Sequence, residues 1–386
     1  MTANTLQDLR ALIYDPPTPQ LWARLIGLVE GEPDESLREI AVQYVTPFLE
    51  EWPALLRLAP RLWWEAKLRG EPVLCWAWVR GVDVSSASAG AARDALAHPL
   101  MEGLDALAAR SGLSGARLTA LLKEARTDDL RAVDLSGNAL GSAGAIRELQ
   151  RRLPRVELLK LRDNGLSDGR VFDIDAPFAA LRTLDLSENP ITADTLRGLW
   201  FTHALERLHT LRIDDAGIDE VVAEGFSDIA APGLPGLRHL ALAGNALSGG
   251  GLWELAESPL LGSLDTLDLS RNGLFWRDLR GLTRAVRSMG LDALILDGNT
   301  IEDEGVPFLV GWGALRDLRH LSLARNRITD QGAHQLAEAP WLASLERLDL
   351  SENFIGDAGA QALRDALGAR WSKVLVLRGN TGRRAL

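Results

Sequence analysis

Cysteine and histidine are the residues from which a nucleophilic or metal-dependent site would be built, and the chain has one cysteine and six histidines. Cys75 lies in the apolar run Val73-Leu-Cys-Trp-Ala-Trp78, with no histidine beside it. A reactive thiol needs a cationic and accessible setting, so this context predicts a buried, inert thiol. An effector-type enzyme that uses Cys75, such as a ubiquitin ligase, is the alternative.

The histidines are too scattered to form a metal site. His239 and His320 fall at equivalent positions of a repeated pattern, three repeats apart. Neighbouring strands are spaced by about 5 Å, so these side chains cannot share one ion. The sequence contains neither H-E-x-x-H nor G-x-S-x-G, and Gly249-Gly250-Gly251 does not follow a strand as a phosphate-binding loop does. We therefore expect no catalytic, cofactor-binding or metal-binding residues, and we expect that the protein is not an enzyme.

Carboxylates are the remaining candidates for chemistry, because paired carboxylates can perform acid–base catalysis. Acids and bases recur here in two adjacent columns that are expected to point outward from successive strands. The first column holds Asp134, Lys160, Asp185, Arg212, Asp268 and Asp349, and the second holds Arg162, Asp214, Asp297 and Arg378. Because Asp-Leu-Ser simply recurs with the repeat, a regular solvated surface explains these columns better than catalysis does.

The element that positions these columns is the pattern L-x-x-L-x-L-x-x-N-x-[LI], which recurs along most of the chain. Copies begin at Leu130, Val156, Leu181, Leu208, Leu237, Leu264, Leu291, Leu318 and Leu345, and a clipped copy begins at Val374. The asparagine position is filled by Asn138, Asn164, Asn189, Ala216, Asn245, Asn272, Asn299, Asn326, Asn353 and Asn380. Successive copies are 25 to 29 residues apart, which is the mark of a repeat protein.

Each copy predicts one strand and one helix. The L-x-L core alternates with period two, as a strand does, and the asparagine amide is expected to bond backbone groups of adjacent turns. The segment from Thr329 to Leu342 then shows helical spacing, and Pro340 ends the helix. A helix needs about 10 Å of lateral room and a strand about 4.8 Å. The stack is therefore expected to bend, with its strands lining the concave side.

These residues resemble the ribonuclease-inhibitor type of leucine-rich repeat. The match is close at 318–336, 291–309 and 345–363, and it covers roughly residues 100–380. The resemblance implies an α/β fold: a right-handed horseshoe-shaped solenoid with parallel concave strands and convex helices. It also implies a scaffold that binds another protein, often on the concave face, because most members of the family do so. Ala216 departs from the asparagine pattern, and a looser turn is expected there.

The N-terminal region differs from the repeats. Residues 1–85 predict a small all-α domain, or cap, and residues 86–386 predict the repeats, with a degenerate first repeat at 86–112 and a truncated last one. Six of the twelve tryptophans lie in the N-terminal region. They are expected to fill its core; the alternative is an exposed docking patch centred on Trp63-Trp64.

The chain stops soon after Asn380, without a helical half or a cap. An uncovered last strand is a pairing liability. Arg378, Arg383 and Arg384 are expected to blunt it, and the alternative is a homodimer, or another partner, docked at this C-terminal edge strand.

Net charge and composition limit the classes of partner and the cellular compartment that we expect for this chain. The net charge of −11 argues against a nucleic-acid or anionic-membrane partner. The single cysteine, the lack of a signal peptide and the lack of a long apolar run predict a cytoplasmic protein. The Ala-, Leu- and Arg-rich bias suggests a bacterial source.

The surface hypotheses concern protein partners. A concave face of small residues and acids suits a partner with basic loops, and Lys160, Arg162 and Arg212 would form a contrasting basic spot. Phe275-Trp276 on a rim turn is either an anchor for a partner or local packing, and the lengthened loop at 230–236 is a further contact candidate. The leading hypothesis is a protein-binding scaffold, in one version an enzyme inhibitor. The alternative is an activator of a small GTPase.

Overall fold

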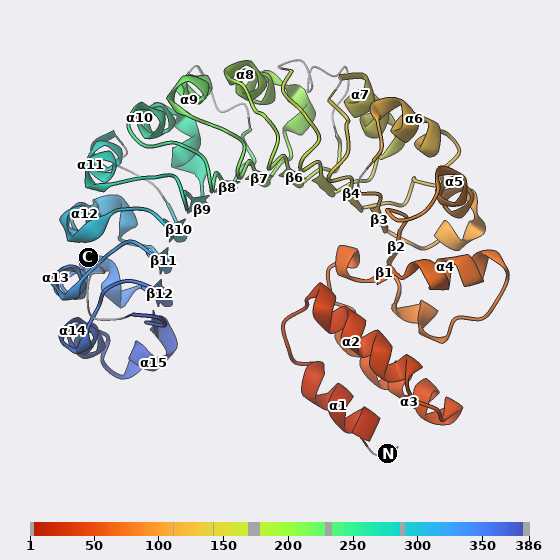
Figure 1. Ribbon diagram of the computed structural model, residues 1–386. Helices are drawn as coiled ribbons and strands as arrows, with labels where there is room; N and C mark the ends of the chain where they lie inside the picture. The colour runs from red at the N-terminus through yellow and green to blue at the C-terminus, as the bar shows by residue number, and fades with distance from the viewer. Residues whose placement is uncertain are drawn as a thin grey trace. The chain divides into compact units, whose positions relative to one another are not determined.

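The computed structural model describes residues 4–110, 112–141, 143–168, 178–227, 234–285 and 290–380. The chain forms two compact units. The first comprises residues 1–139 and 147–161, and the second comprises residues 140–146 and 162–386. Each unit has parallel strands with helices along one side of them, and the helices of residues 4–45 lie beyond the first strand (Figure 1).

The first unit begins with helices and continues as a parallel sheet whose strand order follows the chain. Its helices are α1 (Asn4–Leu12), α2 (Pro19–Glu30), α3 (Glu35–Val45), α4 (Arg61–Leu68), α5 (Ala89–Ala97) and α6 (Gly115–Lys123), and α7 (Ala143–Arg152) spans the division between the units. Its strands are β1 (Leu58–Ala59), β2 (Gly81–Asp83), β3 (Ala106–Ala108), β4 (Ala132–Asp134) and β5 (Leu158–Lys160).

The sheet begins earlier than the sequence predicted, so the expectation that residues 1–85 are purely helical is wrong. Leu58 pairs with Gly81, and Gly81 in turn pairs with Ala106. These first two strands lack the asparagine that marks later repeats, which is why the pattern did not reveal them. A side chain at Gly81 would overlap the carbonyl of Ala106, so glycine is required for this close pairing. The strand expected in the degenerate first repeat is present as β3, and a domain boundary at residue 85 stays a prediction.

The tryptophans fill the core of the first unit, as the simpler of the two hypotheses predicted. Trp63 and Trp64 are both buried, so they form no exposed docking patch. The indole of Trp64 donates to the carbonyl of Asp83 at 3.1 Å, and the indole of Trp78 donates to that of Val42 at 3.2 Å. Buried indole N–H groups that find acceptors allow such large side chains to fill the space between helices and sheet.

The second unit repeats one strand and one helix, again in chain order. Its strands are β6 (Thr183–Asp185), β7 (Thr210–Arg212), β8 (His239–Ala241), β9 (Thr266–Asp268), β10 (Ala293–Ile295), β11 (His320–Ser322), β12 (Arg347–Asp349) and β13 (Leu375–Val376). Its helices are α8 (Ala193–Phe201), α9 (Glu220–Ser227), α10 (Gly250–Glu257), α11 (Trp276–Ala285), α12 (Glu302–Val310), α13 (Asp330–Ala337), α14 (Asp357–Leu367) and α15 (Trp371–Val374). Its strands follow a curve with the helices on the outer side, which confirms the predicted α/β solenoid (Figure 1).

The repeat asparagines hold neighbouring turns together as predicted. The amide nitrogen of Asn299 donates to the carbonyls of Leu269 and Leu296, at 3.0 and 2.8 Å. Its amide oxygen accepts from the backbone N–H groups of Asn272 and Leu274, at 2.9 and 3.0 Å. One buried side chain thus satisfies four backbone groups in two repeats. The left-handed backbone angle belongs to the residue before each asparagine, as at Gly298, and not to the asparagine itself.

Candidate functional site

The strand register shows the first predicted column in each unit, and the residues of the second predicted column all belong to the second unit. In the second unit the register places Asp185 beside Arg212, Asp268 beside Ile295, and Ser322 beside Asp349. In the first unit Asp134 lies beside Lys160. The strand pairing therefore brings the first-column residues of each unit onto one face.

The first-column aspartates accept hydrogen bonds from residues at the end of their own strand. One carboxylate oxygen of Asp268 accepts from the backbone N–H of Ser270 at 2.9 Å and from its hydroxyl at 2.6 Å. Asp349 binds Ser351 in the same way, at 3.0 and 2.6 Å. The recurring Asp-x-Ser is thus a local turn motif. Asp134 and Asp185 also accept from the following serine N–H and are buried, at 8% exposure each, so they present little carboxylate to a partner.

The second-column acids reach to the next strand. Asp214 accepts from the backbone N–H of Ala243 at 2.9 Å, pairs with Arg212 at 2.5 Å and is 4% exposed. Asp297 accepts from the hydroxyl of Ser322 at 2.6 Å and from the N–H of Ala324 at 2.9 Å. Burial raises the pKa of Asp297, and the negative charges nearby on Asp349 and Asp268 act in the same direction. An ionised Asp297 therefore lies in a setting that disfavours its charge.

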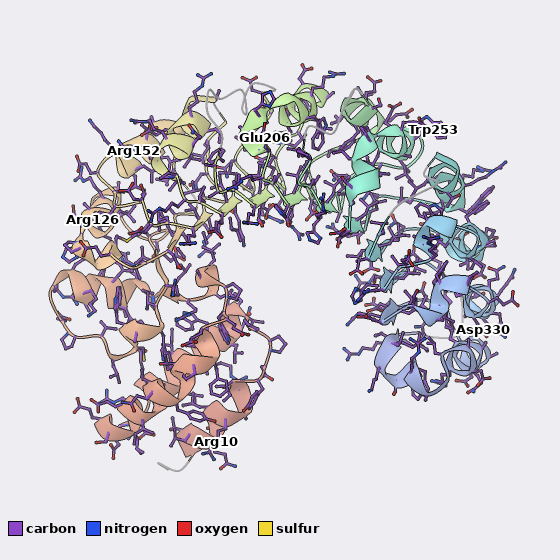
Figure 2. All side chains as sticks on the ribbon, turned by 180° about the vertical axis from the view of Figure 1, so that it is seen from behind. Arg10, Arg126, Arg152, Glu206, Trp253 and Asp330 are labelled. Carbon is purple, nitrogen blue, oxygen red and sulfur yellow. The ribbon has the colours of Figure 1, made fainter. Side chains whose placement is uncertain are left out.

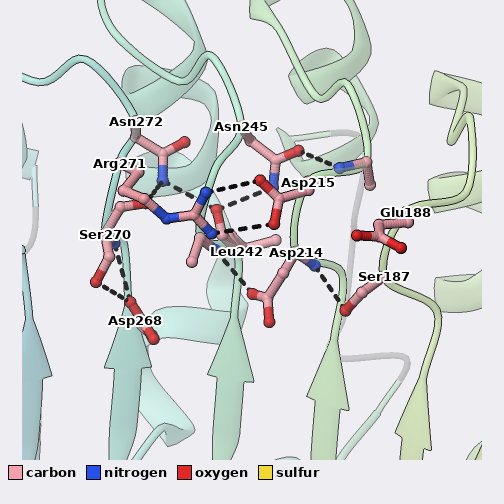
Figure 3. A network of polar contacts seen from close by, with 12 residues as sticks. Ser187, Glu188, Asp214, Asp215, Leu242, Asn245, Asp268, Ser270, Arg271 and Asn272 are labelled. Carbon is pink, nitrogen blue, oxygen red and sulfur yellow. Dashed lines mark hydrogen bonds and ion pairs between the residues drawn. The ribbon is translucent and has the colours of Figure 1, made fainter. Parts of the chain in front are cut away.

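A third row of charges, which the sequence analysis missed, lies in the turns after the strands. Arg271 donates two hydrogen bonds to Asp215, at 2.9 and 3.0 Å (Figure 3). The ion pair passes over Gly244, where any side chain would overlap Asp215. These bonds lower the pKa of Asp215. The sequence does contain a signal for this row of charges. The position immediately before each asparagine is occupied in turn by acidic residues, arginine or glycine.

Ion pairs offset much of the charge on this face of the second unit. Arg325 pairs with Glu352 at 2.7 Å, and Arg347 pairs with Asp349 at 3.1 Å. Burial opposes ionisation of Asp349, but hydrogen bonds from Ser351 and Arg347 outweigh it and lower the pKa of this carboxyl. Within the described ranges, Asp268 and Asp297 form no ion pair and are only partly buried, so both can attract a cation from outside.

The two arginines of the predicted basic spot are paired with acidic side chains. Arg162 pairs with Glu188, and Arg212 pairs with Asp214. Lys160 belongs to the first unit, whereas Arg162 and Arg212 belong to the second. The arginines of this group are thus engaged within the second unit.

Phe275 and Trp276 behave differently from each other. Trp276 stacks on Phe308 of the next repeat, with ring centroids 6.3 Å apart and planes inclined by 7°, and Arg277 lies over its ring. Phe275 remains 37% exposed at the start of α11. On the outer helix side, Trp253 of α10 is also exposed (Figure 2). Trp276 therefore fits local packing, and Phe275 keeps surface for a contact.

Two other candidates lie wholly or partly outside the described residues. The loop at 230–236 is only partly described, and Arg383 and Arg384 are not described at all.

The chemical alternatives have little support in the geometry. Cys75 is 2% exposed, and burial raises the pKa of its thiol to about 12. The parts of the chain that the structure describes hold no cluster of three or more His, Cys, Asp or Glu residues placed to bind a metal. Within the same ranges, no helix is both long and apolar enough to cross a membrane.

Comparison with known families agrees with the repeat geometry. Residues 129–147, 314–337 and 342–363 match the family model described as Leucine Rich repeat. The chain contains leucine-rich repeats. The matched segments include the asparagines Asn138, Asn326 and Asn353, which lie in the turns described above.

Two solved structures show weaker likenesses. An internalin from Listeria monocytogenes is similar with a TM-score of 0.44 and 17% identity, over 79% of this chain and 74% of that one. The structure of a TLR13–ssRNA13 complex gives a TM-score of 0.40 and 20% identity, over 81% of this chain and 53% of that one. No curated protein matches the chain. The fold assignment therefore rests on the strand pairing and the repeat match.

Proposed function

We propose that this chain is a protein-binding scaffold of the ribonuclease-inhibitor-like type, and that its second unit recognises basic side chains of a protein partner. The observation that carries the proposal is the pair Asp268 and Asp297, which stand without an ion-pair partner among the described residues of a face whose other acids are largely offset.

The setting of the pair favours recognition over catalysis. Asp297 is partly buried, and its raised pKa indicates that its negative charge is incompletely compensated. A partner's arginine or lysine that reaches this carboxylate would supply the missing charge. Ile295 lies beside Asp268 on the neighbouring strand and offers apolar surface for the stem of such a side chain. Small neighbours such as Ala241 and Ala324 leave room for a partner to approach.

The details of the proposal on compartment, source, activity and oligomeric state come from the amino-acid sequence. A cytoplasmic and bacterial setting fits the single cysteine and the composition. Inhibition of an enzyme is the specific version of the scaffold, and activation of a small GTPase is the alternative. A homodimer through β13, the last strand, is a further arrangement, since its described residues pair only with β12. Nucleic acid and membrane are not the proposed partners, because the chain carries a net charge of −11.

The test compares binding by the wild type with that of Asp268→Asn/Asp297→Asn. These changes remove both charges but keep oxygen acceptors for Ser270 and for Ser322. Asp317→Asn is the matched control, because Asp317 is a highly exposed acid that pairs only with adjacent Arg316 among the described residues. A partner captured from cytoplasmic extract would be identified, purified and titrated by calorimetry against all three proteins.

We expect the double variant to bind at least about tenfold more weakly, with a smaller salt dependence, while the control binds like the wild type. Equal affinities of all three proteins would refute recognition through Asp268 and Asp297. If the partner is an enzyme or a GTPase, its turnover with and without the scaffold separates inhibition, activation and plain binding.

A further inference from the structure

The first unit contains a hollow of about 460 Å³ between α5 and α6, which lie side by side (Figure 1). Its walls include Val84, Ala92, Ala109, Leu113 and Leu121, all apolar. Pockets of about 300–1,000 Å³ with mostly apolar walls are typical of small-molecule sites. The hollow belongs to the first unit, whereas Asp268 and Asp297 belong to the second.

The hollow exists because both helices carry small residues where they face it. Ala89 and Gly90 of α5 and Ala120 of α6 are among its walls. A side chain built at Gly90 would meet no atom within 4 Å, so this part of the wall opens onto empty space. The hollow is open to solvent on one side, since Ala89 and Ala120 are exposed.

The charges around the hollow all have one sign. Arg93 of α5, Arg117 of α6 and Arg110 are its charged lining residues, and no acidic side chain is among the described residues that line it. Arg110 pairs with Asp83. Arg93 and Arg117 form no ion pair within the described ranges, although the chain has 53 acids against 42 Lys and Arg residues. A purely cationic lining in an acidic protein indicates a preference for an anion.

We propose that this hollow binds a small carboxylate with an apolar body, such as a medium-chain fatty acid or an aryl carboxylate. The acidic group would lie against Arg93 and Arg117, and the apolar body would lie against the Ala, Val and Leu walls. The first turns of α5 and α6 add favourable partial positive charge, since helix N-termini attract anions. The site is independent of the proposed protein-binding face.

The experiment uses anilinonaphthalene sulfonate, which combines an anionic group with an aromatic body and fluoresces more strongly in apolar pockets. The full-length protein is titrated with this probe, and bound probe is then displaced with decanoate, decanol or decylamine. We expect saturable binding at one site, displacement by decanoate, and at least about tenfold weaker displacement by the neutral and cationic analogues, because charge-assisted hydrogen bonds are strong.

Variants then locate the site. Gly90→Leu fills the hollow, and leucine is a better helix former than glycine, so the fold should persist. Arg93→Glu/Arg117→Glu reverses the rim charge. Arg280→Glu on α11 is the matched control, because Arg280 is likewise exposed and without an ion pair in the described part of the chain. Ala120→Leu serves as a second filling variant if Gly90→Leu does not fold, with circular dichroism as the check.

We expect each filling or charge-reversing variant to weaken probe and decanoate binding at least about tenfold, and the control to bind like the wild type. Binding that is unchanged in folded filling variants would place the probe elsewhere and overturn the proposal. Equal displacement by decanoate and decylamine would overturn the assignment of an anionic ligand.

Discussion

Arg271 and Asp215 lie 56 residues apart in the sequence and are joined by two hydrogen bonds that pass over the turn between them. The intervening residue is Gly244, whose φ is +70°. The ion pair therefore links a repeat with the repeat after next, and glycine is the residue that leaves the path open.

Gly244→Ala tests this dependence on glycine. The added methyl would overlap Asp215, and alanine at a left-handed angle costs about 1–2 kcal/mol by itself. Gly217→Ala is the control, because Gly217 has a similar φ of +72° but its new methyl would meet no atom within 4 Å. We expect the urea midpoint to fall further for Gly244→Ala, and equal shifts would show that the ion pair does not depend on the gap.

Asn299→Ala tests the asparagine ladder. The change removes four hydrogen bonds and leaves buried backbone groups of two repeats without that partner, so we expect a loss of about 2–4 kcal/mol in the free energy of unfolding. Urea denaturation followed by tryptophan fluorescence measures the loss. Asn380→Ala, in the last repeat, is the comparison, because Asn380 is less buried. An equal or smaller loss for Asn299→Ala would contradict a dominant role for the buried amide.

The pH dependence of stability differs in sign between Asp215 and Asp297. The pKa of Asp215 is lowered in the folded chain, so its ion pair adds stability above the unfolded pKa and loses it as pH falls through the folded pKa. Asp215→Asn should therefore reduce stability at neutral pH, by less than about 1 kcal/mol because the pair is largely exposed, and should make no difference in strong acid.

For Asp297 the folded pKa is raised, so the cost of its charge is fully present above the folded pKa and disappears below the unfolded one. Asp297→Asn is expected to unfold at higher urea concentration than the wild type near neutral pH and to converge with it in acid. Thermal and urea unfolding at several pH values measure both variants. A stability loss for Asp297→Asn at neutral pH would contradict a destabilising charge at this carboxyl.

Alkylation distinguishes an inert from a reactive Cys75. With a pKa of about 12, about one thiol in ten thousand is ionised at pH 8. Iodoacetamide is expected to leave the native protein unlabelled and to label it fully in urea, as mass spectrometry would show. Rapid labelling of the folded chain would contradict the buried thiol and revive the effector-enzyme alternative.

The repeat pattern was enough to predict the strands of the later repeats. The two columns that contain Asp268 and Asp297 were predicted from the alternation of inward and outward residues along each strand. Strands β1 and β2 escaped prediction because their turns lack the asparagine, and nearby tryptophans and helices dominated the pattern. The bond between Arg271 and Asp215 was also missed, since it depends on how far a flexible side chain reaches across a glycine.

Whether an acid on this face is available to a partner could not be predicted from its position in a column. Asp185 and Asp268 occupy equivalent strand positions and both accept from the backbone N–H of the following serine, yet Asp185 is buried and Asp268 is not. Asp185 lies beside Arg212, whereas Asp268 lies between Ala241 and Ile295, and these neighbours vary from repeat to repeat while the pattern stays the same.

The pair Asp215–Arg271 also has a mechanical consequence. The asparagine amides link neighbouring turns of the solenoid, and Ala216 cannot make the side-chain links that an asparagine would make to the preceding repeat. On the other side of this turn, Asn245 bonds to Ala216 and Ile218, and the guanidinium of Arg271 ties Asp215 to a turn two repeats further on. Under force applied at the chain ends, the repeats from Asp215 to Arg271 should therefore separate as one block, and Arg271→Gln should lower the force at which they come apart from one another.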